Sequence, residues 1–192
     1  LEGYPMDDAT ASPEANPPGQ ADGLFQPGGA DHLWYVVHTK PRCEKKASKT
    51  CLDREIRHYL PLHQSRPKQS KGQRRYSFDV PLLPGYIFAC CNWAERLELL
   101  CSGYLVRTIE VVDQALLLGE LRQIYLASSG LNDLNVYPQL KRGRSIRVVR
   151  GPLQGVSGKI SSRKETYRIV LNISILGTAV AAEVDMDDVE LL

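Results

Sequence analysis

The chain has 192 residues, of which 43% are hydrophobic and 24% charged, the composition of an ordinary globular protein. This length suffices for one ordinary domain or two small ones. No apolar run approaches the roughly twenty residues that a membrane span needs. The acidic amino-terminal segment lacks the basic and apolar stretches of a secretion signal, so we expect a cytoplasmic protein.

The formal net charge of +2 hides an uneven distribution of charge along the chain. Residues 1–32 hold six acidic residues and no Lys or Arg, so residues 33–192 have 24 basic and 16 acidic residues, a net +8. Within residues 38–75, twelve basic residues accompany only three acidic ones. Such a concentration indicates a surface for a polyanion such as nucleic acid, with a merely solvated face as the alternative.

Residues 1–32 also contain five Pro, five Gly and few apolar residues, which predicts a disordered acidic tail. The apolar and β-branched residues from Trp34 to Thr39 then predict a first strand. Pro41 suits the first turn of a helix. Residues 42–57 have apolar side chains at helical spacing and lysines on the other faces, which predicts a basic amphipathic helix.

Further elements follow this helix in alternating order. Strands are predicted at 58–62, 76–80, 85–91 and 104–112, helices at 93–100 and 116–126, and a basic hairpin loop at 64–75. This order predicts an α+β sandwich over residues 33–127, with helices covering a mainly antiparallel sheet. Residues 128–139 are rich in turn-forming residues and lack a period, which predicts a linker.

The last part of the chain reads as all β. Short β-rich runs occupy 145–150, 156–161, 167–173, 179–184 and 188–191, with turn residues between them. Short, regularly spaced strands of this kind predict a small barrel over residues 140–192.

Cysteine usage and motif content argue against an enzyme or a metal protein. The five cysteines form no CxxC motif, which favours a reduced setting without a disulfide framework. Zinc ligation by Cys43, Cys51, His58 and His63 would follow no common ligand spacing, so buried thiols are favoured. We find no Ser/His/Asp or Cys/His array and no phosphate-binding Gly loop, and we expect no catalysis and no cofactor.

Three motifs in this order carry a family resemblance. They are residues 34–40 (WYVVHTK), residues 81–88 (PLLPGYIF) and residues 147–158 (RVVRGPLQGVSG). Together they resemble the NusG family of transcription elongation factors, in which an amino-terminal NGN domain precedes a KOW domain, an SH3-like barrel. The resemblance covers residues 33–192, with Gly151, Gly155 and Gly158 matching the KOW pattern and Leu83 replacing the family's aromatic residue.

The resemblance implies a non-catalytic, monomeric factor that binds the clamp helices of RNA polymerase, bridges the DNA cleft and suppresses pausing or termination. An apolar patch on the NGN sheet would make this contact, since aromatic and aliphatic side chains carry such interfaces. The residues expected in the patch are Tyr35, Val37, Leu83, Tyr86 and Phe88. Because strand residues alternate between two faces, some of these five are expected to be core instead.

The basic helix and hairpin would lie near the non-template DNA strand. Cations would contact phosphates and rings would stack on bases. The residues expected there are His38, Lys40, Arg42, Lys46, Lys49, Arg74, Arg75 and Tyr76.

The resemblance also implies a protein partner for the KOW barrel, through a loop that contains Ile175, Leu176 and Thr178. Housekeeping NusG has Phe-Gly-Arg where this chain has Leu176-Gly177-Thr178, so a contact with Rho is expected to be weak, whereas a contact with the ribosomal subunit NusE stays open. This difference favours a specialised paralogue of the RfaH, UpxY and LoaP group that acts on particular operons. A housekeeping NusG and a KOW-type RNA- or ribosome-binding protein remain the alternatives.

Overall fold

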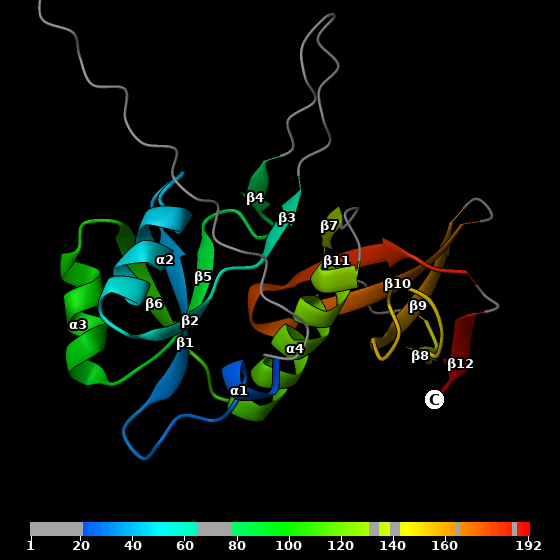
Figure 1. Cartoon of the computed structure of the whole chain (residues 1–192), viewed down its shortest axis with the longest axis horizontal. Coiled ribbons are helices and arrows are strands. Elements are labelled where there is room, and N and C mark those ends of the chain that lie inside the picture. The colour runs from blue at the N-terminus through cyan, green and yellow to red at the C-terminus, as the bar shows by residue number, and fades with distance from the viewer. Residues whose placement is uncertain (1–20, 65–77, 131–134, 139–142, 164–165, 186–187) are drawn as a thin grey trace, which may run out of the picture.

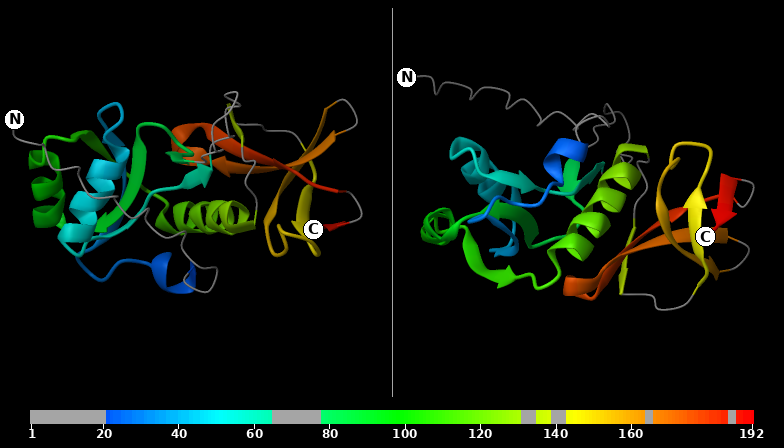
Figure 2. Two further views of the ribbon diagram at one scale, coloured as in Figure 1. Left: turned by 45° about the horizontal axis from the view of Figure 1, so that its top comes forward. Right: turned by 90° about the horizontal axis from the view of Figure 1, so that it is seen from below.

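The computed structural model describes residues 21–64, 78–130, 135–138, 143–163, 166–185 and 188–192. These residues form two large antiparallel sheets with one long helix between them, and a small two-stranded sheet (Figures 1 and 2). Among the described residues no helix is long and apolar enough to cross a membrane.

The first sheet has four strands in the order β2-β5-β1-β6, and its pairs are antiparallel. Its members are β1 (Leu33–Thr39), β2 (Arg57–Tyr59), β5 (Tyr86–Cys91) and β6 (Leu105–Glu110). A separate two-stranded ladder joins β3 (Leu62–Gln64) to β4 (Asp79–Pro81), on either side of the predicted basic loop. The order of strands and helices confirms the predicted α+β sandwich.

Helices cover both faces of the first sheet. One face carries α2 (Glu44–Asp53) and α3 (Trp93–Cys101), and the other carries α4 (Gln114–Gly130). The central strands are therefore buried on both sides, which explains why Val36, Val37, Ile87 and Phe88 are all inaccessible to solvent. Side chains at alternate positions of β1 and β5 therefore pack into two different cores, one on each face of the sheet.

The beginning of α3 is marked by a local capping signal, whereas the beginning of α2 differs from the prediction. Asn92 caps α3 by accepting a hydrogen bond from the backbone N of Glu95 (2.9 Å), and the Glu95 carboxylate accepts one from the backbone N of Asn92 (2.9 Å). The helix predicted from Arg42 begins only at Glu44, because Arg42 has a left-handed φ of 61°. Pro41 therefore lies in the turn before α2 rather than in its first helical turn.

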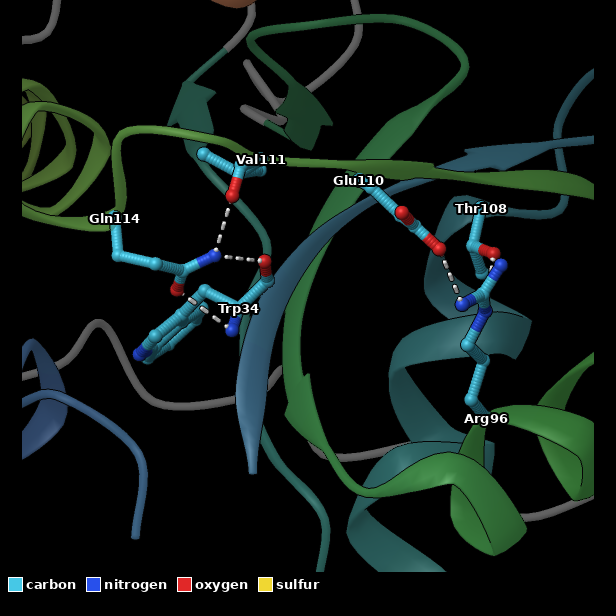
Figure 3. A network of polar contacts seen from close by, with 6 residues as sticks. All are labelled: Trp34, Arg96, Thr108, Glu110, Val111 and Gln114. Atoms are coloured by element: carbon cyan, nitrogen blue, oxygen red, sulfur yellow. Dashed lines mark hydrogen bonds and ion pairs between the residues drawn. The ribbon is translucent and has the colours of Figure 1, made fainter. Parts of the chain in front are cut away.

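Gln114, the first residue of α4, forms hydrogen bonds to the first sheet (Figure 3). The Gln114 side chain accepts a hydrogen bond from the Trp34 backbone N (2.9 Å) and donates to the backbone oxygens of Trp34 (2.9 Å) and Val111 (3.0 Å). On the other side of β1, Arg96 of α3 lies over the Tyr35 ring at 4.7 Å and donates to Thr108 (2.7 Å) and Glu110 (3.0 Å). Helix α4 is thus anchored to β1 through Gln114, and α3 is anchored to β1 through the Tyr35 ring and to β6 through Thr108 and Glu110.

The packed chain begins earlier than the predicted boundary at residue 33. After the short helix α1 (Ala21–Leu24), Phe25 is only 2% exposed and meets the rings of Tyr59 (5.0 Å) and Tyr125 (5.6 Å) edge-on. One aromatic residue in a polar segment is enough to hold that segment against the domain. Residues 1–20, the rest of the predicted tail, lie outside the described residues.

The second sheet contains six strands in the order β12-β8-β9-β10-β11-β7. They are β7 (Asn135–Pro138), β8 (Ser145–Val148), β9 (Ser157–Arg163), β10 (Thr166–Ile173), β11 (Thr178–Glu183) and β12 (Val189–Leu191). Five of these strands match the predicted β-rich runs. The described pairings do not close β12 onto β7, so the sheet is compatible with the predicted barrel without showing its closure. Strand β7 falls inside the segment predicted to be a linker and pairs with β11.

Gly158 shows why glycine is required within the second sheet. A Cβ atom at this position would lie 2.7 Å from the Val170 backbone oxygen and 2.9 Å from side-chain atoms of Ile169 and Leu171. Strands β9 and β10 could not approach as closely with any other residue there.

The second sheet packs against α4, so one continuous apolar cluster runs from the first sheet through α4 into the second. Two polar contacts accompany this packing. The Gln123 side-chain oxygen accepts a hydrogen bond from the Ser157 backbone N (2.7 Å), and the Glu120 carboxylate accepts bonds from the backbone N (2.9 Å) and Oγ (2.5 Å) of Ser174. Helix α4 is therefore the shared layer of the molecule (Figure 2).

Candidate functional site

Two half-exposed rings lie at the end of the first sheet where β1 finishes and β5 begins. His38 and Tyr86 are paired across these strands, and their rings stack at 5.0 Å with an interplanar angle of 19°. Both belong to the sheet face that α4 covers farther along, where Val36 and Phe88 are buried. The Nδ1 atom of His38 is buried and has no hydrogen-bond partner among the described residues. The pair is thus a small aromatic platform at the surface, with an unpaired polar atom beneath it.

The turn before Tyr86 positions this platform. Gly85 has a φ of 85°, and a Cβ atom there would contact the His38 ring at 3.7 Å. Its backbone N donates a 2.7 Å hydrogen bond to the carboxylate of Glu44, while its oxygen accepts one from Thr39 (2.8 Å). Glu44 is buried in the first turn of α2, where a carboxylate is stabilised by the helix dipole. The turn, the helix and both strands are therefore held as one unit.

Cations border the platform on the side of α2. Lys40 and Arg42 follow β1 directly and are exposed, as are Lys46 and Lys49 on α2. The Lys46 ammonium also lies 5.8 Å from the centre of the Tyr104 ring. Of the eight residues predicted to bind nucleic acid, these four therefore lie on the side of α2, whereas His38 belongs to the platform on the opposite face of the sheet. The other three, Arg74, Arg75 and Tyr76, lie outside the described residues.

The five residues predicted to contact the polymerase do not form one exposed patch. Tyr35 and Val37 are buried against α2 and α3, whereas Leu83 and Phe88 are buried in the core that includes α4. The cause is the coverage of both sheet faces, which makes alternate strand residues core residues in either direction. Only Tyr86 retains an accessible surface.

The structure pairs Tyr86 with His38, a residue that sequence reasoning had assigned to the nucleic-acid set. Strand alternation from Trp34 through Val36 could have placed His38 on the same face as these two core residues. Which residue of β5 lies beside His38 depends on the strand register, which no local pattern specifies. The contact of Tyr86, predicted to bind the polymerase, with His38, predicted to bind nucleic acid, is therefore a result of the tertiary structure.

The predicted partner loop of the second sheet is a short 3₁₀ turn, η2 (Ser174–Leu176), closed by Gly177 with a left-handed φ of 60°. Ile175 and Leu176 are half-buried against the shared apolar cluster. Thr178 is half-buried too, and its hydroxyl donates to the Leu176 oxygen (3.2 Å). The loop lies beside α4, because Ser174 binds Glu120.

The ionisable groups near the cores do not form a reactive site. Burial raises the pKa of the Cys51 and Cys91 thiols to about 12, so neither is a thiolate at neutral pH. His58 contacts Ser48 Oγ through Nε2 (2.8 Å) and the Ile56 oxygen through Nδ1 (2.9 Å), and burial lowers its pKa. No group of three potential metal ligands occurs among the residues that the structure describes.

Comparison with known proteins agrees with this architecture. The family described as transcription termination factor NusG matches residues 32–123, which run from before β1 into α4. The amino-terminal domain of the chain thus resembles that of the NusG family.

Solved structures that match the chain include one of Thermotoga maritima NusG that concerns its domain interaction. It is 20% identical, with a TM-score of 0.44 over 85% of this chain and 98% of that chain. Two conformations of the MjSpt4:Spt5 complex are each 13% identical, with TM-scores of 0.24, and cover 83% of this chain and 97% and 98% of theirs. No curated protein matches the sequence.

Proposed function

We propose that the chain is a transcription elongation and antitermination factor that uses the His38–Tyr86 platform to bind the clamp helices of RNA polymerase. The observation that carries the proposal is the stacked, half-exposed pair at the sheet end, in a domain of the NusG family. The platform offers aromatic surface without the cost of ordering flexible side chains, because Gly85 and Glu44 already hold it. The buried residues Tyr35, Val37, Leu83 and Phe88 then act as its support rather than as contacts.

The cations beside the platform would bind the non-template DNA strand while the platform holds the polymerase. Lys40 and Arg42 follow His38 within a few residues, so both partners would be contacted from one end of the sheet. Attraction of phosphates to such side chains does not depend on sequence and weakens with salt. A factor bound in this way would bridge the DNA cleft and suppress pausing.

In vitro transcription on a paused template tests this proposal. We expect the intact chain to shorten the pause and Tyr86→Ala to abolish most of that effect. Trp93→Ala is a matched control, because Trp93 is also an exposed aromatic residue but lies on α3, away from the platform. Equal pause suppression by both variants would refute a role for the platform, and absence of polymerase binding by the intact chain would refute the function.

A specialised role at particular operons is favoured over a housekeeping role by the loop that contains η2. It presents Leu176 and Thr178, whereas the housekeeping family pattern has an aromatic and a cationic residue. Interfaces depend strongly on such anchors, so the contact with Rho would be weak while a contact with NusE stays open. A Rho-dependent termination assay separates the roles, because a housekeeping factor stimulates Rho and this chain should not.

A further inference from the structure

An open pocket of about 370 Å³ lies where the beginning of α4 meets η2, at the end of β1 opposite to the platform. Its apolar lining includes Val111, Val112 and Leu116 from the first domain and Ile175 from the second. Val112 is fully exposed and Leu116 is 48% exposed. We call these four residues, with the acidic side chains around them, the junction groove.

Both parts of the molecule are needed to build the junction groove. Glu120 of α4 accepts hydrogen bonds from the backbone N and Oγ of Ser174, which places Ile175 next to the first turns of α4. Gln123 and Ser157 hold the same helix to the second sheet one turn later. The groove therefore exists only while the second sheet is docked on α4.

The rim of the junction groove is negatively charged. Glu110, Asp113 and Glu120 line it, and no Lys or Arg does so among the described residues. Glu110 is paired with Arg96 at 3.0 Å. The hydrogen bonds described for Asp113 and Glu120 come from uncharged donors, the Leu116 backbone N for Asp113 and Ser174 for Glu120. Two carboxylates thus remain without a described cationic partner.

We propose that the junction groove binds a basic segment of a partner protein that also carries aliphatic side chains. Aliphatic side chains would cover Val112, Leu116 and Ile175 and remove their apolar surface from water. Lys or Arg side chains would reach the carboxylates of Asp113 and Glu120. A nucleic acid would be repelled by the same carboxylates, so this surface selects a partner of the opposite charge to the one expected at the platform.

Binding in the junction groove is linked to the docking of the two sheets. Because the groove is complete only in the docked arrangement, a bound segment stabilises that arrangement by its own binding free energy. The inference does not rest on polymerase binding, since none of the groove residues belongs to the platform.

Methyl-labelled full-length protein, titrated in NMR with a short synthetic amphipathic peptide of leucine and lysine, tests the inference. We expect saturable shifts of the methyl signals of Val112, Leu116 and Ile175. Two matched peptides separate the contributions: one with glutamate in place of lysine and one with serine in place of leucine should each bind more weakly by about tenfold or more.

Variants at one exposed position locate the site. Val112→Lys should weaken binding of the leucine–lysine peptide by about tenfold or more, whereas Val112→Glu should retain or strengthen it. Val106→Lys is the matched control, because Val106 is also an exposed valine but lies near the other end of β6. Each variant should suppress pausing as well as the intact chain does, which separates failure of this inference from failure of the proposed function.

Three results would overturn the inference. The first is an absence of shifts at the groove methyls, and the second is equal affinity of Val112→Lys and Val106→Lys. The third is equal binding of the serine-containing peptide, which would reduce the site to general attraction between charges.

Discussion

The two ends of β1 present surfaces of opposite character. At one end His38 and Tyr86 form an aromatic platform beside Lys40 and Arg42, and at the other end the junction groove combines aliphatic side chains with carboxylates. Between them the sheet is sealed by helices on both faces. The difference teaches that β1 has accessible surface around its two ends, where it leaves the cover of the helices, and that these two surfaces differ in charge.

The strongest test of this division compares two residues of the same face of β5. Phe88 is inaccessible to solvent, so Phe88→Ala should lower the free energy of unfolding by about 3–5 kcal/mol. Tyr86→Ala should cost much less stability, because its ring is half-exposed, yet it should weaken polymerase binding. Urea denaturation and a pull-down with purified polymerase measure the two effects. Similar stability losses in both variants would contradict the separation of core from platform.

The support of the platform can be broken at Glu44. Glu44→Ala leaves the buried hydrogen bond of the Gly85 backbone N unmade, and we expect a loss of about 1–3 kcal/mol in the free energy of unfolding. Glu44→Gln keeps an acceptor and loses only the charge near the helix start, so its cost should stay below about 1 kcal/mol. Urea denaturation of the two variants gives the comparison, and equal losses would show that the charge rather than the hydrogen bond matters.

The pH dependence of stability sharpens the contrast between buried and exposed groups. Burial lowers the pKa of His58 below its ordinary value of 6.5, opposed in part by the bond to the Ile56 oxygen. The unfolded chain therefore binds the proton more readily, and the free energy of unfolding should fall as the pH drops below 6.5. The slope from this one group is at most about 1.4 kcal/mol per pH unit.

Denaturation of His58→Gln across the same pH range should show a smaller slope than the intact chain. His63→Gln is a suitable control, since His63 lies in β3 and takes no part in the contacts of His58 with Ser48 and Ile56. An unchanged slope in His58→Gln would assign the pH dependence to other groups.

The smallest expected effects concern the cations beside the platform. Lys40→Gln and Arg42→Gln should each reduce the slope of log affinity for single-stranded DNA against log salt by about 0.7. Arg144→Gln, an exposed change before β8, should leave that slope unchanged. A titration of fluorescent single-stranded DNA at several salt concentrations measures these slopes. Equal slopes for all three variants would show that Lys40 and Arg42 form a solvated surface and do not bind DNA.

The partner loop offers a gain of function instead of a loss. Replacing Leu176 by Phe and Thr178 by Arg restores the family triplet around Gly177, whose left-handed φ already suits the turn. We expect the double variant to increase Rho-dependent termination relative to the intact chain. No response to Rho in either protein would mean that docking against α4, and not the loop sequence, limits the contact.

The sequence by itself determined the two-part architecture. Periodicity and turn residues were sufficient for the helices α2, α3 and α4 and for the strands of both sheets other than β7, because these signals are local. The cations at residues 40–49 were predictable for the same reason, since charged side chains stay exposed wherever the chain folds. Phe25 was missed because a single aromatic residue in a Pro- and Gly-rich segment has no period.

Only the tertiary structure decided which predicted residues are accessible. Tyr35, Val37, Leu83 and Phe88 have the composition of a binding patch, but their burial depends on which helices cover each sheet face. The first two are covered by α2 and α3, and the other two lie in the core that includes α4. The stacking of His38 on Tyr86 depends on strand register, and the junction groove depends on contacts between residues about sixty positions apart. Contacts between residues that are distant in the sequence do not change the local residue pattern. The accessible residues of the site could therefore be identified only from the tertiary structure.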